Sequence, residues 1–162
     1  QYSFPRALRS YKDYVLWKHS MFSDWVLTEP KEQLVNHSIR FRTISHPELT
    51  KFRELFYRGS KKIIPGDIAK LLDPLALAVW FMDDGNVKRW NGQPCAFHLN
   101  SQSFSLADNK VLAEALCDRY QVRADPEINN GYTRLYIGKH SIDRFEQVVK
   151  KHVIPSMSYK LG

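Results

Sequence analysis

Two short segments of the chain alternate apolar and polar residues. Residues 39–43 read Ile-Arg-Phe-Arg-Thr, and residues 133–137 read Thr-Arg-Leu-Tyr-Ile. A period of two places the apolar side chains on one face of a β-strand and the polar side chains on the other. We therefore predict two strands of a sheet with one buried face and one face rich in arginine and aromatic residues. Helices would cover the buried face.

Residues 73–85 form a largely apolar stretch, which predicts a buried helix. Asp73 suits the N-cap, and Pro74 suits the first helical position, where a missing N–H group costs nothing. Apolar residues recur at i, i+3, i+4 and i+7 from Leu75, and the other sides of the helix are apolar as well. The stripe that we predict to meet a partner helix consists of Leu75, Ala78, Val79 and Met82.

The chain also contains an internal repeat. Each predicted strand is followed by a histidine, a phenylalanine and a proline, at offsets of 94, 93 and 90 residues: His46 and His140, Phe52 and Phe145, Pro65 and Pro155. Residues 2–4 and 97–99 come earlier in the two copies, and each is followed by an amphipathic stretch, residues 11–26 and 106–122. This duplication predicts the order strand, helix, strand, helix in each copy and an α+β fold, with a first repeat over residues 1–70 and a second over 71–162.

The helix at residues 73–85 has no counterpart in the first repeat. At an offset near 94, the counterpart of Asp84 would lie about ten residues before Gln1. We therefore expect a truncated chain whose first repeat lacks this helix. The unpartnered apolar stripe would then be exposed, which predicts self-association.

The formal net charge of +7 is unevenly distributed along the chain, and this distribution bears on the kind of partner that the protein binds. Residues 1–70 hold 13 Lys and Arg against 7 Asp and Glu, whereas residues 71–162 hold 11 against 10. A basic surface favours a polyanion such as nucleic acid, although a solvated basic face without a partner has the same composition.

No apolar run approaches the roughly 20 residues that span a bilayer. Cys95 and Cys117 form no CxxC pair, and no zinc-binding spacing is present.

The end of the predicted helix is acidic, which is unusual. Asp83 and Asp84 face the negative end of the helix dipole, which disfavours each by a few tenths to about 1 kcal/mol. One interpretation is a simple Asp-Gly cap, with Gly85 in the left-handed conformation. The other is a bound divalent cation, because hard carboxylate oxygens suit Mg²⁺.

Residues 77–85, Leu-Ala-Val-Trp-Phe-Met-Asp-Asp-Gly, resemble the nine-residue motif of LAGLIDADG homing endonucleases of the organellar, intron-encoded type. The identities are Leu77, Ala78, Asp84 and Gly85, and Val79 replaces the motif's first glycine. Residues 25–27, 61–65, 99–104 and 159–161 are similar to further family segments in the same order. The resemblance covers essentially the whole chain.

This resemblance implies a pseudo-twofold duplicated fold, in which two motif helices pack together and an antiparallel, saddle-shaped sheet covers DNA. It implies site-specific, Mg²⁺-dependent (or Mn²⁺-dependent) cleavage of double-stranded DNA in support of intron mobility, in a mitochondrion or chloroplast. Asp84 would be the catalytic, metal-binding carboxylate. Lys62, Lys160 and Asn129 match polar positions near the active sites of similar enzymes. Either lysine would instead contact only DNA backbone or solvent if it lay away from the reacting phosphate, and Asn129 is equally suited to a turn.

Base contacts would come from the polar face of the strands. The candidates are Arg40, Arg42, Lys88, Trp90, His98, Asn100, Arg134 and Tyr136. Some of these would touch only phosphates. The main rival hypothesis is an intron maturase that binds intron RNA with the same fold and does not cut DNA. A basic structural protein is a third hypothesis, but it leaves the repeat and the acidic helix end unexplained.

Overall fold

The computed structural model describes residues 6–33, 38–129 and 131–161. The chain forms two compact units. The first consists of residues 1–53 and 154–157, and the second of residues 54–153 and 158–162. The boundary after Arg53 precedes the predicted repeat boundary, and residues 68–72 are held within the second unit. There the Arg119 guanidinium donates to the carbonyl of Lys70 (3.1 Å), and the Tyr120 hydroxyl donates to that of Leu72 (2.6 Å).

The first unit has the order helix, hairpin, helix. Its elements are α1 (Arg6–Met21), the short 3-10 helix η1 (Ser23–Trp25), β1 (Lys31–Glu32), β2 (Ile39–Arg40) and most of α2 (Pro47–Phe56). The predicted alternation is confirmed, because Ile39 and Phe41 are half-buried whereas Arg40 and Arg42 are exposed. The strand is shorter than predicted, since Thr43 pairs separately with Val26. The strand predicted at residues 2–4 lies outside the described residues.

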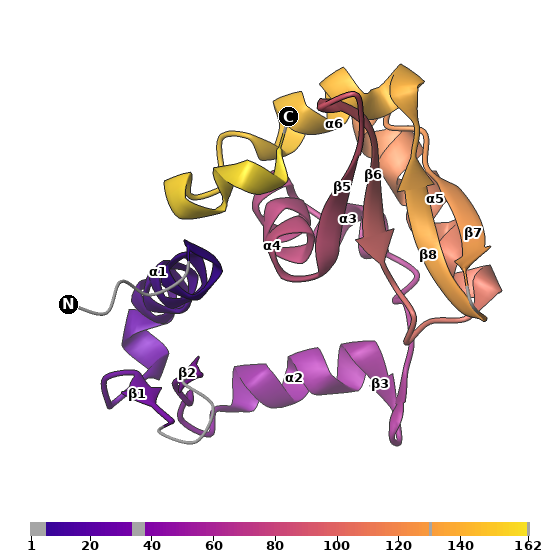
Figure 1. Ribbon diagram of the computed structural model, residues 1–162. Helices are drawn as coiled ribbons and strands as arrows, with labels where there is room; N and C mark the ends of the chain where they lie inside the picture. Colours follow the sequence, from indigo (N-terminus) through magenta and orange to yellow (C-terminus); the bar gives the residue numbers. More distant parts are fainter. Residues whose placement is uncertain (1–5, 34–37, 130, 162) are drawn as a thin grey trace. The chain divides into compact units, whose positions relative to one another are not determined.

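The second unit holds a four-stranded antiparallel sheet in the order β5-β6-β8-β7 (Figure 1). Its strands are β5 (Gly85–Trp90), β6 (Gln93–Asn100), β7 (Asp125–Asn129) and β8 (Tyr132–Ile137). Its other elements are β3 (Tyr57–Arg58), β4 (Lys61–Lys62), α3 (Ile68–Leu71), α4 (Pro74–Asp84), α5 (Leu106–Tyr120), η2 (Lys139–Ser141), α6 (Ile142–Val149) and the end of η3 (Pro155–Lys160). The series α5, β7-β8, α6 repeats the helix, hairpin, helix order of the first unit.

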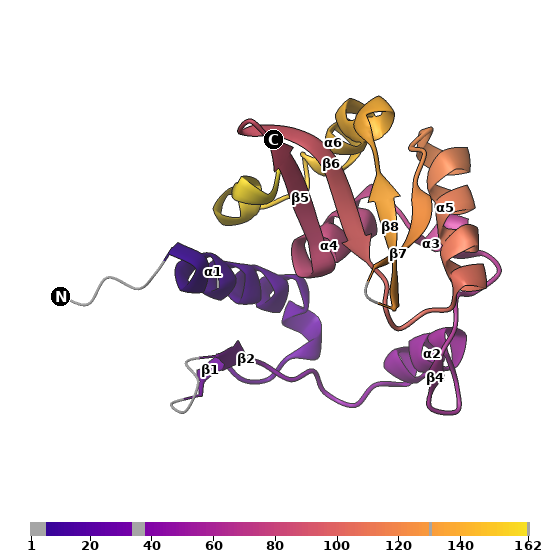
Figure 2. The same ribbon diagram turned by 45° about the vertical axis from the view of Figure 1, so that its right-hand side comes forward.

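One face of this sheet forms the core. Phe97 and Leu99 of β6 and Leu135 and Ile137 of β8 are fully buried in it, and the helices α4, α5 and α6 cover this face (Figure 2). The Phe81 ring of α4 stands edge-on to Phe97 and Phe145, with ring centroids 5.3 and 5.2 Å apart. Edge-to-face packing is a favourable aromatic arrangement. The predicted α+β architecture, with helices on the apolar face of an antiparallel sheet, is thereby confirmed.

The stripe predicted for a partner helix is not exposed. Ala78 and Met82 are buried, and Leu75 and Val79 are half-buried. Ala78 turns toward the core with Leu77 and Phe81, so the side of α4 that packs on the sheet overlaps the predicted stripe. Of the four residues, only Ala78 belongs to the core of the second unit, so self-association through this stripe stays a prediction. In the part of the chain that the structure describes, no helix is long and apolar enough to cross a membrane.

Candidate active site and nucleic-acid interface

The acidic end of α4 runs directly into β5. At its other end, the Asp73 carboxylate accepts the Ala76 N–H at 2.7 Å, and Pro74 follows the cap as predicted. Asp83 and Asp84 are exposed. The interpretation of Gly85 as a left-handed cap is wrong, because its φ of −87° and ψ of 154° are extended. Glycine is needed there for space, since a Cβ would lie 2.5 Å from the carbonyl oxygen of Phe81 and against its ring.

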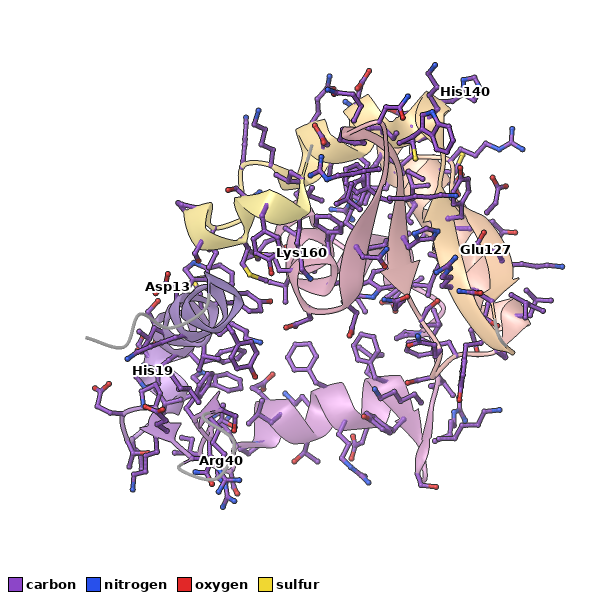
Figure 3. The ribbon with its side chains drawn as sticks, viewed as in Figure 1. Asp13, His19, Arg40, Glu127, His140 and Lys160 are labelled. Atoms are coloured by element: carbon purple, nitrogen blue, oxygen red, sulfur yellow. The ribbon has the colours of Figure 1, made fainter. Side chains whose placement is uncertain are left out.

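The positive charge of Lys160 lies at the negative, C-terminal end of helix α4. Its Nζ donates to the carbonyl oxygens of Phe81 (3.3 Å), Met82 (2.5 Å) and Gly85 (3.0 Å). A cation at this position opposes the negative end of the helix dipole and satisfies carbonyls that the helix leaves unpaired. Burial lowers the pKa of Lys160, whereas the nearby Asp83 and Asp84 raise it. Figure 3 shows Lys160 beside the coil of α4.

The structure thus gives Lys160 a role that neither sequence interpretation predicted. Its ammonium group is directed at main-chain carbonyls and supports the helix end that carries the aspartates. Arg89, which the sequence reasoning missed, holds the same C-terminal segment, because its Nη2 donates to the carbonyl of Leu161 at 2.7 Å. These contacts join residues more than 70 positions apart, so no local pattern signals them.

Asn100 and Lys62 lie at the pocket that Asp84 lines. The Asn100 Nδ2 donates to the main-chain oxygen of Asp84 at 2.7 Å, and the Trp80 Nε1 donates to the carbonyl of Asn100 at 3.2 Å. Lys62, on β4, lines the same pocket of about 490 Å³ together with the loop of residues 101–104. The sequence predicted Asn100 only as a base-contacting residue, but the structure also places it against the Asp84 peptide.

Asn129 is not brought to this site. It ends β7, where it pairs with Tyr132, and the strand order places β7 at the opposite edge of the sheet from β5. Three strand spacings of about 4.8 Å correspond to roughly 14 Å. The expectation that Asn129 lies near Asp84 is therefore wrong. The alternative of a turn fits better, because Gly131 has a φ of 80°, although Asn130 lies outside the described residues.

The carboxylates Asp83 and Asp84 are the donors that suit a hard divalent cation at this site. Within residues 6–33, 38–129 and 131–161, no cluster of three or more Asp, Glu, His or Cys side chains could hold a metal ion. Because Mg²⁺ keeps several waters and often shares phosphate oxygens, one or two exposed carboxylates are a suitable protein contribution. The residues therefore fit an ion whose remaining ligands come from water, nucleic acid or a further carboxylate.

The face of the sheet opposite the core is polar. The registers Asn86↔His98, His98↔Tyr136 and Asn100↔Arg134 place these side chains on one face, as the alternation predicts. Lys88 lies on the same face, and a register shift after it precedes Trp90, which is 73% exposed. In the first unit, Arg40 and Arg42 are exposed as well. Arginine, lysine, asparagine and aromatic side chains are the types that contact bases and phosphates.

His98 differs from the other candidates on this face because it is only 5% exposed. Its Nδ1 lies 3.3 Å from the Asn86 Nδ2, and its Nε2 lies 3.3 Å from the Glu127 Oε1. Burial and Arg134 lower the pKa of His98, whereas Glu127 raises it. With both ring nitrogens occupied, His98 supports its neighbours, so the expectation that it contacts bases directly is not supported by the structure.

Glu127 is the second residue that the sequence reasoning missed. It is an acidic side chain on the polar face, two residues after Asp125 on the same strand, and it contacts Arg134. A signal for it was present, because Asp125, Glu127 and Asn129 alternate with Pro126 and Ile128 in the segment that becomes β7. Figure 3 shows Glu127 on the four-stranded sheet.

Comparison with known proteins defines the class. The sequence model of the LAGLIDADG DNA endonuclease family matches residues 3–145, so the chain belongs to this family. It is 28% identical to the cytochrome b mRNA maturase bI2 of Debaryomyces hansenii, over 94% of this chain and 61% of the relative. It is also 28% identical to the probable intron-encoded endonuclease 1 of Wickerhamomyces canadensis, over 87% of this chain and 65% of the relative.

A solved structure with the same fold is that of the homing endonuclease I-WcaI bound to its DNA recognition sequence. The TM-score is 0.82 at 26% identity, over 93% of this chain and 71% of that chain. The resemblance stated from the motif and the fold that it implies are both confirmed. The chain spans less than two thirds of the length of the two curated relatives described above.

Proposed function

We propose that the protein is a site-specific, metal-dependent endonuclease that cuts both strands of DNA and supports intron mobility. The observation that carries the proposal is the junction of α4 and β5, where exposed Asp84 meets the polar face of the sheet through Asn100. A metal-binding carboxylate beside a face suited to groove contacts combines cleavage with recognition. The similar enzyme I-WcaI was solved with its DNA recognition sequence.

Asp84 is the proposed metal ligand, and Asp83 lies beside it in sequence. The proposed ion is Mg²⁺ or Mn²⁺, which would supply an activated water and compensate the charge of the phosphate. Within the protein, Asn100 fixes the peptide of Asp84, and Lys160 fixes the helix end through three carbonyls. Lys62 brings a positive charge to the same pocket, where it would stabilise charge developing on a phosphate.

Cutting two strands requires metal-binding groups at two phosphates. Because α4 is the motif helix of the described residues, the proposal requires a second carboxylate, from another motif helix of the same protein or from a second copy of the chain. Self-association enters the proposal in this sense, because a second copy of the chain is one source of the second carboxylate.

The test is a cleavage assay on intronless target DNA with Mg²⁺, using the protein expressed from its complete reading frame. We expect Asp84→Asn to lower the cleavage rate by about 100-fold or more, the scale on which loss of one transition-state group acts. Asp118→Asn removes the same charge from an exposed position on α5 and should cut normally. Full cutting by Asp84→Asn would contradict the assignment of Asp84.

A second candidate function is that of an intron maturase, which would bind intron RNA. It is favoured by the 28% identity to cytochrome b mRNA maturases of Debaryomyces hansenii and Saccharomyces cerevisiae. Salt-sensitive binding to intron RNA, together with no cleavage of intronless DNA by the wild-type protein, would support this alternative over the nuclease. The same intron-encoded relatives support an organellar location as part of the proposal.

A further inference from the structure

We propose that Arg134 reads one guanine of the target and that Glu127 is the residue that positions it for this purpose. This inference rests on the proposed DNA-binding function and assigns a specificity-determining pair within it. The two residues face each other directly in the register of β7 and β8. Arg134 is therefore assigned to a base, although the sequence alone left open whether it contacts a base or a phosphate.

Glu127 holds the Arg134 guanidinium through two of its nitrogens. The Arg134 Nε donates to the Glu127 Oε1 at 2.5 Å, and the Arg134 Nη2 contacts the same oxygen. Two nitrogens on one carboxylate oxygen fix the plane of the guanidinium. The side chains remain 24% and 37% exposed, so the pair can be reached from the polar face of the sheet.

The Arg134 guanidinium has more N–H donors than Glu127 uses. A guanidinium carries five N–H groups. Glu127 occupies the side formed by Nε and one hydrogen of Nη2, which leaves both hydrogens of Nη1 and one of Nη2 at the far end of the Arg134 side chain. Parallel donors of this kind match the O6 and N7 acceptors that guanine presents in the major groove, where bidentate arginine is the commonest specific contact. The remaining donors therefore fit a guanine edge.

The charge of Glu127 largely neutralises that of Arg134. An arginine already paired with a carboxylate adds little net positive charge, so it contributes little to attracting phosphates. Lys88, which is exposed on β5 of the same face, is better suited to a phosphate. On the polar face of the sheet, the Glu127–Arg134 pair is thus suited to distinguish one base from another. Lys88 is suited to strengthen DNA binding independently of the base sequence.

Glu127 is itself held by side chains of the neighbouring strands. The His98 Nε2 lies 3.3 Å from the same Oε1 atom, and Asn86 holds the other ring nitrogen. The Tyr136 ring lies beside His98, with centroids 5.5 Å apart. Each of the four strands thereby contributes at least one side chain to the network of Asn86, His98, Glu127, Arg134 and Tyr136. Such support holds a contacting side chain in one geometry, which recognition of a single base requires.

The experiment is selection from a randomised duplex DNA library without Mg²⁺, using the full-length protein. The variants are Glu127→Gln, Arg134→Lys and Lys88→Gln, with thermal melts to establish that each is folded. We expect the wild type to enrich a guanine at one position, and Glu127→Gln and Arg134→Lys each to reduce that preference by about tenfold. Arg134→Lys keeps the charge but loses the bidentate fork, so a loss of preference would not be an effect of charge.

Salt dependence separates the roles of these residues. Arg134→Lys should leave the slope of log K against log salt unchanged. Glu127→Gln frees the charge of Arg134 and should leave the slope unchanged or make it steeper, whereas Lys88→Gln should keep the base preference and reduce the slope by about 0.9. An unchanged guanine preference in folded Glu127→Gln would overturn the inference. So would a loss of cytosine preference in Glu127→Gln alone, because it would mean that the carboxylate itself reads a base. If the wild type enriches no sequence at all, the proposed function fails instead.

Discussion

The Nζ of Lys160 lies 2.5 Å from the carbonyl oxygen of Met82, and 3.0 Å from that of Gly85. A lysine near the C-terminal end of the described chain thus closes the motif helix at the point where two aspartates would otherwise face the negative end of the dipole. Arg89 binds the same segment through Leu161. The acidic helix end is therefore capped by Lys160 at its main-chain carbonyls, while the Asp84 carboxylate remains exposed.

Replacement of Lys160 by methionine should destabilise the protein. The substitution keeps the aliphatic stem but removes three charge-assisted hydrogen bonds, and we expect a loss of about 1–3 kcal/mol in the free energy of unfolding. Lys151→Met, at an exposed position just after α6, is the matched control and should change little. Denaturant unfolding of both variants measures the difference, and equal stabilities would show that the cap contributes nothing.

Gly85→Ala should destabilise the protein by about 1–3 kcal/mol or more, as overpacking of a rigid core does. The added methyl would meet the backbone oxygen of Phe81 at 2.5 Å and the ring of that fully buried residue. Gly66→Ala is the control, since a Cβ there has nothing within 4 Å, and it should be neutral or stabilising by up to about 1 kcal/mol. Thermal melts in parallel give the comparison, and a stable Gly85→Ala protein would mean that the close approach is relaxed in solution.

Asn100→Ala should reduce cleavage more than it reduces stability. The amide holds the main-chain oxygen of Asp84 at 2.7 Å, so its loss costs about 0.5–1.5 kcal/mol of stability and frees the peptide that carries the metal-binding carboxylate. A positioning role predicts a fall in kcat by about tenfold, with KM nearly unchanged. A rise in KM at unchanged kcat would instead indicate that Asn100 serves only to bind DNA.

His98 should titrate below its ordinary pKa of 6.5, because burial and Arg134 lower its pKa more than Glu127 raises it. The unfolded chain then binds this proton at a higher pH than the folded protein does. The stability contribution is therefore complete above pH 6.5 and is lost as the pH falls through the folded pKa of His98.

An NMR titration of the His98 ring, assigned with His98→Gln, measures this value in the absence of DNA. Glu127→Gln should lower the pKa of His98 further, because Glu127 raises it. A value above 6.5 in the wild type would contradict the prediction, because it would mean that the contact with Glu127 outweighs burial and Arg134.

Local sequence was sufficient for much of the fold. Asp73 and Pro74 begin α4 as predicted, because capping depends only on the first turn of the helix. The alternation in residues 133–137 correctly assigned Leu135 and Ile137 to the core and Arg134 and Tyr136 to the polar face, since neighbouring side chains of a strand must point in opposite directions.

The tertiary structure decided how the candidate site is assembled. Asn129 was misplaced because the strand order that separates β7 from β5 is not contained in either strand. The cap by Lys160 and the contact between Asn100 and Asp84 join segments 16 to 79 positions apart. His98 was expected to face DNA, but the partners that cover it come from three other strands. The periodicity of apolar and polar residues determines which side of a single helix or strand faces the core. A contact between two elements depends on strand register and on packing, which only the folded chain determines.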